Sequence, residues 1–274
     1  NQVMIGSLMV HLHRAQDEID EKLVRHIVLN NLRYYRTKFK EEYGELILCN
    51  DDKEYWRREY FPNYKAGRKK DRASSPYDWD KIFTCLNMVR DELKDNFPYI
   101  SMRIPHAEAD DIIAVLLMNR GEVKNIIVSS DKDFIQLHCA AVDQYSPVSK
   151  KLINGKDPRL YIREHILKGD RSDGVPNILS DDNVFVEGRR QRPLSKKKLN
   201  ELICAGFLYT SLNDEEKKNY DRNRKLIDLT CIPQELEEKI KSEFDNIKVA
   251  TRDKILNYFI SRKLKTLIEV IDEF

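Results

Sequence analysis

Residues 124–134 read KNIIVSSDKDF, and this stretch decides the fold class. Its apolar, β-branched first half is typical of a short buried strand, and its acidic second half is typical of a turn. Residues 45–51, ELILCND, repeat the arrangement of an apolar strand that ends in a carboxylate. Residues 99–104, YISMRI, are a third candidate strand. The chain therefore contains several short strands, and two of them end in acidic residues.

Segments with helical periodicity separate these strands. Apolar residues recur at helical spacing over about 20–40, over 78–95 (DWDKIFTCLNMVRDELKD) and over 107–122 (AEADDIIAVLLMNRGE). Strands that alternate with helices predict an α/β fold with a central, mostly parallel sheet flanked by helices.

The pattern changes near Asp157–Pro158. Strand signals become sparse beyond this point, and helical segments dominate to residue 274, most clearly over 194–209 and 252–274. We therefore predict two domains, an α/β domain over 1–157 and a smaller helical domain over 158–274.

Composition excludes several classes of protein. The chain has 274 residues, 48 Lys and Arg against 46 Asp and Glu, and a net charge of +2, so only the distribution of charge is informative. Its five cysteines are an odd number without a C-x-x-C pair, which indicates reduced thiols, no zinc site and a reducing, cytoplasmic compartment. The longest apolar run, Ile112–Met118, is too short to span a membrane.

Carboxylates gather at the predicted strand ends and at the start of the helix between those strands. Ligands of open parallel sheets bind beyond the carboxyl ends of the strands. A further acidic pair lies in LKGDRSD, residues 167–173. The candidate metal ligands are Asp51, Glu108, Asp110, Asp111, Asp131, Asp133, Asp170 and Asp173.

Such a set of oxygen ligands suits Mg²⁺ or Mn²⁺. Two ions of this kind can activate water and stabilise the leaving oxygen of a phosphodiester. Each element has another interpretation: acids in the first turn favour a helix dipole, Asp131 can cap a helix, and Asp170 and Asp173 can be turn residues. Their conjunction at one end of one sheet favours the metal site.

Two basic runs accompany the acidic residues. YKAGRKKDR (64–72) carries five cations and one acid, and RRQRPLSKKK (189–198) carries six cations. Basic clusters on a nearly neutral chain indicate contact with a polyanion, and aromatic residues beside the first run can stack on bases, although a solvated charge run is the alternative. The candidate nucleic-acid contacts are Tyr64, Lys69, Lys70, Arg72, Arg189, Arg190, Arg192, Lys196, Lys197 and Lys198.

Four motifs together resemble the 5′-nuclease family, also called flap endonucleases. They are LCNDDKEYWRREYFPNYKAGR (48–68), AEADDIIAVL (107–116), VSSDKDFIQL (128–137) and LKGDRSDGVPNI (167–178). The resemblance covers nearly the whole chain. It implies a nuclease (PIN-like) domain over 1–157 with an arch at about 53–80. It also implies that the domain over 158–274 binds duplexes through a helix–three-turn–helix-like element.

The resemblance also implies residue roles. Asp51, Glu108, Asp110, Asp111 and Asp131 match the ligands of the tighter metal site, whereas Asp133, Asp170 and Asp173 match those of the second site. Lys65 and Arg68 match catalytic arch residues that contact the scissile phosphate, and Tyr64 is expected to stack on the terminal base. The implied partners are duplex, flap and RNA–DNA hybrid nucleic acids, together with a sliding clamp and a single-stranded DNA-binding protein.

Three departures from the family pattern modify these expectations. The family has another metal-binding aspartate on a strand that would precede Asn1, and activity is expected to be weak if that strand is lacking. The family's glycine-rich hairpin after the GD motif is replaced by residues 179–198, which puts a bound K⁺ ion in doubt. Gly174 stands where asparagine is usual, and we expect little consequence.

The preferred hypothesis is a monomeric, magnesium-dependent 5′-nuclease with two Mg²⁺ ions, which Mn²⁺ can replace. It would remove RNA primers and flaps during DNA replication, in the host cytoplasm if the chain is viral. One alternative is a non-catalytic protein that binds DNA junctions through a degenerate metal site. A phospho-acceptor receiver-like domain is another, but it explains neither the basic runs nor the helical second half.

Overall fold

Strands form at the three places where apolar segments predicted them. The structure, a computed structural model, describes residues 2–15, 19–155, 157–204 and 209–274. The strands form two sheets, the parallel pair β1–β2 and the three-stranded sheet β3–β4–β5, in which β3 and β4 are parallel and β5 is antiparallel to β4. The bounds are β1 Ile47–Asn50, β2 Ile100–Arg103, β3 Asn125–Val128, β4 Val142–Ser146 and β5 Lys151–Leu152. The predicted α/β class is therefore confirmed.

The sequence patterns did not reveal β4 and β5. Two side chains of β4, Gln144 and Ser146, are polar although they are buried, so the strand lacks an apolar run. Gln144 makes the burial possible because its Nε2 donates to the carbonyl oxygens of Ser129 and Asp131, at 2.9 and 2.6 Å. This amide also fixes the turn that follows β3.

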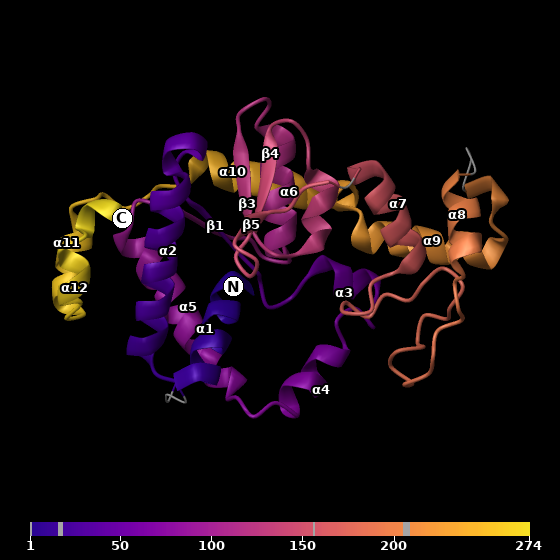
Figure 1. The fold of residues 1–274 in the computed structure, drawn as a ribbon, viewed down its shortest axis with the longest axis horizontal. Helices are drawn as coiled ribbons and strands as arrows, with labels where there is room; N and C mark the ends of the chain where they lie inside the picture. Colours follow the sequence, from indigo (N-terminus) through magenta and orange to yellow (C-terminus); the bar gives the residue numbers. More distant parts are fainter. Residues whose placement is uncertain (1, 16–18, 156, 205–208) are drawn as a thin grey trace.

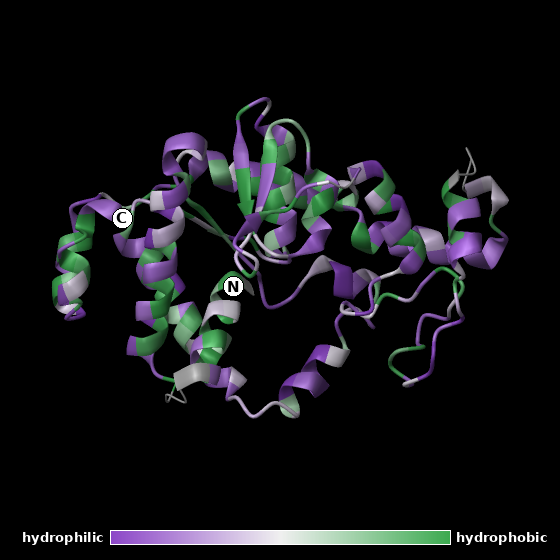
Figure 2. Cartoon of the chain, viewed as in Figure 1, coloured by the Kyte–Doolittle hydropathy of each residue, from purple (hydrophilic) through white to green (hydrophobic). Residues whose placement is uncertain are grey.

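Helices cover the strands (Figures 1 and 2), and the two largest apolar cores lie among these elements. One core joins α1, α2 and α5, whereas the other lies between the strands and α6. Asp20 caps α2 by accepting a hydrogen bond from the backbone nitrogen of Leu23 at 2.7 Å, and Gly44 ends that helix with a positive φ of 85°. The bounds are α1 Gln2–Ala15, α2 Glu21–Tyr43, α5 Trp79–Asn96 and α6 Ala109–Asn119.

Two short helices leave the end of β1 and form a span that returns at α5 (Figure 1). They are α3 (Trp56–Tyr60) and α4 (Gly67–Ala73), and they occupy the region where an arch was expected. We call residues 53–78 the arch. None of the α4 residues is buried, whereas α3 is anchored by the buried Trp56 and Arg57.

Helices predominate after residue 157, and this part of the chain packs in three places. The helices α7, α8 and α9 cluster together, but α10 packs on α6, and α11 packs on α5. Phe274 is fully buried in the core of α2 and α5, with its ring 5.9 Å from that of Phe97. The bounds are α7 Pro158–Lys168, α8 Lys196–Cys204, α9 Asp214–Ile227, α10 Gln234–Asn246, α11 Lys254–Ser261 and α12 Lys265–Ile268, with 3₁₀ turns η1 Lys132–Leu137, η2 Tyr209–Ser211, η3 Leu229–Cys231 and η4 Ile271–Glu273.

A cavity of about 730 Å³ lies between β1 and β3. Within the described ranges, neither strand has a partner along the edge that borders the cavity. Apolar side chains of α2, β1 and β3 form much of its lining, and the residues just beyond both strands complete it. No helix in the described part of the chain is long and apolar enough to cross a lipid bilayer.

The last helices pack on the core of α1, α2 and α5, and this packing predicts that Phe274 is needed for stability. Phe274→Ala should lower the free energy of unfolding by about 3–5 kcal/mol, because it removes a buried ring and leaves a cavity. Urea unfolding measures this change. Leu256→Ala on α11, where the side chain is 43% exposed, is the control and should change stability little. Equal losses in the two variants would contradict the packing described here.

Candidate metal centre

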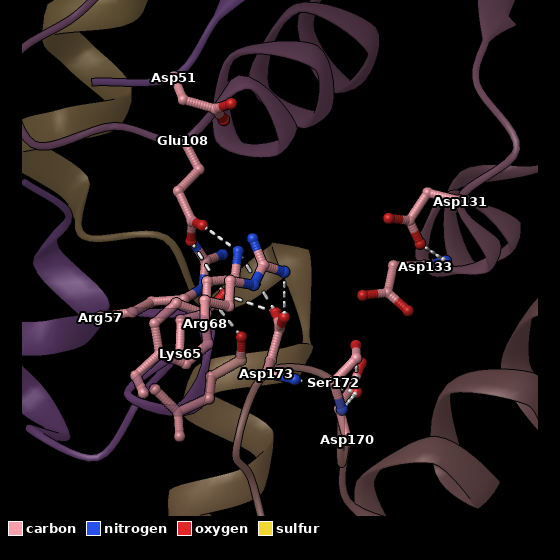
Figure 3. Close-up of polar contacts among 12 residues, drawn as sticks. Asp51, Arg57, Lys65, Arg68, Glu108, Asp131, Asp133, Asp170, Ser172 and Asp173 are labelled. Atoms are coloured by element: carbon pink, nitrogen blue, oxygen red, sulfur yellow. Dashed lines mark hydrogen bonds and ion pairs between the residues drawn. The ribbon is translucent and has the colours of Figure 1, made fainter. Parts of the chain in front are cut away.

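Carboxylates follow the ends of β1 and β3 and line the cavity between these two strands. Figure 3 labels two of them, Asp51 and Asp131. Asp51 follows β1, and its Oδ1 accepts a hydrogen bond from the backbone nitrogen of Ala109 at 2.9 Å. Asp131 follows β3, and its Oδ1 accepts from the backbone nitrogen of Asp133 at 3.0 Å, so it caps the η1 turn. Capping occupies one oxygen of Asp131 and is compatible with a metal-binding role for the other.

The start of α6 supplies the next group of acids. Glu108 is the N-cap residue, and it forms a capping box with Asp111 at the third position of the helix. Asp110 lies between them. Negative side chains in the first turn also complement the helix dipole, so the local fold explains why three acids can gather here.

Seven of the eight predicted acids line two adjoining hollows. Asp51, Glu108, Asp110 and Asp131 line the large cavity between β1 and β3. A much smaller hollow is lined by Asp110, Asp133, Asp170 and Asp173, and Asp110 therefore joins the two. The eighth acid, Asp111, lines neither of them.

Crowding of these carboxylates is visible in their pKa values. Burial raises the pKa of Asp110 well above its usual range, and the negative charges of Glu108, Asp131 and Asp51 raise it further, against the opposing effect of Lys65. Burial also raises the pKa of Asp133, and Asp131 adds to this effect. The fold therefore holds carboxylates where their charged forms are disfavoured without added positive charge.

Cations of the arch meet the acids directly. The Nζ atom of Lys65 forms an ion pair with Glu108 and lies 3.4 Å from Oδ2 of Asp173. Arg68 pairs with Oδ1 of Asp173 at 2.7 Å. Burial lowers the pKa of Lys65, but Glu108 and Asp173 outweigh burial and hold it above its usual value. The two predicted catalytic cations thus lie beside the predicted ligands of both sites.

Gly174 matters more than the sequence suggested. Its φ is +73°, and a Cβ atom there would lie 2.9 Å from the carbonyl oxygen of Asn63 in the arch. Next to it, the backbone nitrogen of Lys65 donates to the carbonyl oxygen of Asp173 at 2.7 Å. Lys65 itself has a positive φ of 56°. The expectation that glycine has little consequence here is wrong, because the missing side chain lets the arch approach this turn.

Sequence reasoning missed Arg57, which is 2% exposed. Its Nη1 lies 2.9 Å from Oε2 of Glu108, its Nη2 lies 2.8 Å from Oδ1 of Asp111, and its Nε donates to the carbonyl oxygen of Leu226 at 2.9 Å. In the sequence Arg57 belongs to the charged segment WRREY, where nothing distinguishes it from the exposed Arg58.

His165 was missed as well. Its Nε2 lies 3.1 Å from Oδ1 of Asp133 and 3.7 Å from Oδ2 of Asp170. Burial lowers the pKa of His165, but the two carboxylates more than compensate and the pKa is raised overall. The only hint in the sequence was that His165 lies five residues before Asp170, near the end of a helix, where its side chain can reach the same site.

Two predicted residues have other surroundings than expected. Asp111 is fully buried. Its carboxylate pairs with Arg57, lies 3.2 Å from the indole nitrogen of Trp56 and completes the capping box of α6. Tyr64 is also buried, and its hydroxyl lies 3.0 Å from Glu108 and 2.9 Å from Asp173. Its ring is therefore not presented to a base in this structure.

The basic runs project cations at two places. On α4, Lys69, Lys70 and Arg72 are exposed. In the second run, Arg189, Arg192 and Lys198 form ion pairs with neighbouring acids. In the structure as described, Arg190, Lys196 and Lys197 take part in none of the ion pairs. The second run lies in the loop before α8 and at the start of that helix, at the end of the molecule opposite α11 and α12 (Figure 1).

Comparison with known protein families assigns both parts of the chain. Residues 13–164 match the family described as "5′-3′ exonuclease, N-terminal resolvase-like domain". Residues 156–274 match the family described as "T4 RNase H, C terminal". The junction of the two matches lies at the start of α7.

Two curated relatives support this assignment. Ribonuclease H of Enterobacteria phage T4 is 35% identical over 288 aligned positions, which cover 100% of this chain and 93% of the relative. Flap endonuclease Xni of Shewanella sp. (strain MR-4) is 30% identical over 142 positions, which cover 48% of this chain and 51% of that protein.

Two solved structures from bacteriophage T5 have the same fold. The T5 5′-exonuclease with bound zinc ions has a TM-score of 0.58 at 17% identity and covers 88% of this chain and 96% of its own. The T5 flap endonuclease D15, in a complex with DNA and metal ions, has a TM-score of 0.54 at 18% identity and covers 78% and 88%.

The contacts of Arg57 predict a large cost for its removal. Arg57→Met should destabilise the protein by about 3–5 kcal/mol, because it leaves Glu108 and Asp111 as buried carboxylates without their shared cation. Urea unfolding in EDTA measures the change. Arg58→Met, at the exposed neighbour, is the matched control. A similar small effect for both variants would mean that Arg57 does not hold the site together.

The crowding of negative charge around Asp110 predicts that a neutral residue there stabilises the protein, whereas the loss of Arg57 destabilises it. Without divalent ions at neutral pH, Asp110→Asn should raise the melting temperature by about 2 °C or more, because it removes a disfavoured buried charge. The stabilisation that Mg²⁺ or Mn²⁺ gives the parent protein should shrink in this variant. Differential scanning calorimetry with and without each ion measures both effects, and Asp253→Asn, at an exposed position, is the control. A lower melting temperature in EDTA would refute this account of the cluster.

Proposed function

Because the chain belongs to the 5′-3′ exonuclease family and is a nuclease, we propose that it is a magnesium-dependent 5′-nuclease. Its substrates would be RNA or DNA strands with 5′ ends in duplexes, RNA–DNA hybrids and flaps. The relative named ribonuclease H suggests activity on RNA, and the relatives named flap endonucleases suggest cleavage at flaps. Removal of RNA primers and flaps during replication is the corresponding biological role.

The observation that carries the proposal is that seven carboxylates line two adjoining hollows, where two arch cations pair with Glu108 and Asp173. Figure 3 shows these two pairs beside the other labelled acids. Carboxylates alone would repel a polyanion. From the arch, Lys65 and Arg68 contact Glu108 and Asp173. A substrate phosphate could replace these carboxylates as the partner of the two cations. This combination suits phosphodiester hydrolysis better than binding alone.

The residues present fit divalent cations. The donors are mainly carboxylate oxygens, which suit Mg²⁺ and Mn²⁺. The raised pKa of Asp110 reflects its burial first and then the neighbouring negative charges, which such ions would offset. Asp51, Glu108, Asp110 and Asp131 would hold one ion, and Asp133, Asp170 and Asp173 a second. When bound, the ions would supply an activated water and stabilise the leaving oxygen.

The side chains of this chain would orient the substrate. Lys65 and Arg68 can donate to the scissile phosphate and offset the charge that develops on it. The exposed cations of α4 and of the run 189–198 would hold the flanking backbone through phosphate contacts. Terminal bases must unpair to bring the phosphate to the acids, which costs a few kcal/mol.

The partners and assembly state belong to the same proposal. The protein would act as a monomer on duplexes and flaps, together with a sliding clamp and a single-stranded DNA-binding protein of the replication machinery. These partners follow from the resemblance to replication nucleases. Pull-down of purified clamp and of single-stranded DNA-binding protein tests them separately from cleavage.

Asp131→Asn tests the catalytic assignment. The asparagine keeps the oxygen that caps η1, so the fold should persist, whereas cleavage of a labelled RNA–DNA hybrid and of a 5′-flap duplex in Mg²⁺ should fall at least about 100-fold. Binding of an uncleaved duplex should remain. Asp253→Asn is the control, and EDTA should abolish cleavage by the parent protein. Normal cleavage by the Asp131→Asn protein would show that the site is assigned wrongly.

A further inference from the structure

A histidine contributes a nitrogen to the otherwise acidic edge. Asp133, His165 and Asp170 each offer one ligand atom, and these three atoms lie within 4.8 Å of one another. They come from three elements, the η1 turn, the last turn of α7 and the loop that follows α7. Figure 3 shows Asp133 and Asp170 on the same side of the site. The spacing of the three atoms is compatible with a single cation bound among them.

The turn after α7 orients the carboxylate of Asp170. Gly169 ends α7 with a φ of 67°, and it must be glycine because a Cβ would collide with the carbonyl oxygen of Val175 at 2.4 Å. Asp170 then turns its Oδ1 to Ser172, whose backbone nitrogen and hydroxyl both donate at 2.7 Å. Its Oδ2 is the atom that approaches His165, at 3.7 Å. The turn therefore leaves Oδ2 of Asp170 facing the imidazole of His165.

The imidazole nitrogen points between the carboxylates. Nε2 of His165 is buried and has no well-directed hydrogen bond in the described parts of the chain, although Oδ1 of Asp133 is only 3.1 Å away. The ring of Tyr161 lies 5.5 Å from the imidazole, at 30° to it, and limits its movement. A histidine that served only as a counter-charge would be expected to point at one oxygen. This nitrogen is placed as a ligand atom would be.

We propose that His165 is a nitrogen ligand of the second cation and makes this half of the site prefer transition-metal ions over Mg²⁺. The inference rests on the proposed function only for the presence of a second cation. Imidazole binds first-row transition metals much better than Mg²⁺, which prefers oxygen. Asp133 and Asp170 would complete the set with one oxygen each. The first cation, held by carboxylates alone, would lack this preference.

Pulsed electron paramagnetic resonance of the Mn²⁺-loaded protein tests the ligand directly. We expect a ¹⁴N coupling from a bound imidazole in the parent protein, and we expect it to disappear in His165→Gln and in His165→Lys. The lysine variant retains a positive charge between the carboxylates, so it separates ligation from charge. His26→Gln, at an exposed histidine of α2, should keep the coupling. Absence of the coupling in the parent protein, or its persistence in His165→Gln, would overturn the inference.

Calorimetric titration of the same proteins tests the preference. His165→Gln should weaken the binding of Mn²⁺ and Co²⁺ at one site by about tenfold or more, and the binding of Mg²⁺ much less. An equal loss for all three ions would identify His165 as a positioning residue and refute ligation. Circular dichroism and a thermal melt check that each variant folds.

These readouts do not depend on cleavage. A protein that shows the coupling but does not cleave nucleic acid would contradict the proposed function and leave the ligand assignment standing. A protein that cleaves nucleic acid in Mg²⁺ but shows no ¹⁴N coupling would contradict the ligand assignment and support the proposed function.

Discussion

The buried guanidinium of Arg57 is the interaction on which the rest of the site depends. It joins the base of the arch to Glu108 and Asp111 at the start of α6, and it binds the carbonyl oxygen of Leu226 at the end of α9. A buried carboxylate pair without a cation would be strongly disfavoured. One side chain therefore fixes three segments that are far apart in the sequence, and it orients the helix whose first turn carries the acids.

The site accumulates negative charge that the fold only partly compensates. Arg57 forms ion pairs with Glu108 and Asp111. From the arch, Lys65 pairs with Glu108, and Arg68 pairs with Asp173. Asp110 has none of these cations as a partner in an ion pair among the described residues, and burial raises its pKa. Such a surplus lowers the stability of the protein by itself and would favour the binding of divalent cations, so stability and the proposed function oppose each other here.

The arch and the loop after α7 are held together by backbone contacts. The carbonyl oxygen of Asp173 accepts from the nitrogen of Lys65, and Gly174 gives the room for that approach. A cation at Asp173 and a phosphate at Lys65 would therefore act on neighbouring backbone atoms. This arrangement physically connects the proposed second cation site with the segment that is proposed to hold the substrate.

The sequence by itself determined the α/β class and most of the acids, because apolar periodicity and acids at strand ends are local properties that a single chain displays. It could not reveal β4, whose buried Gln144 disguises a strand, or distinguish Arg57 from Arg58. Nor could it separate Asp111, which accepts from the backbone nitrogen of Glu108 and pairs with Arg57, from Asp110 beside it. Tertiary structure alone decided these points and the meeting of His165 with Asp133. The reason is that burial, ion pairing and ligand geometry arise only when distant segments pack together.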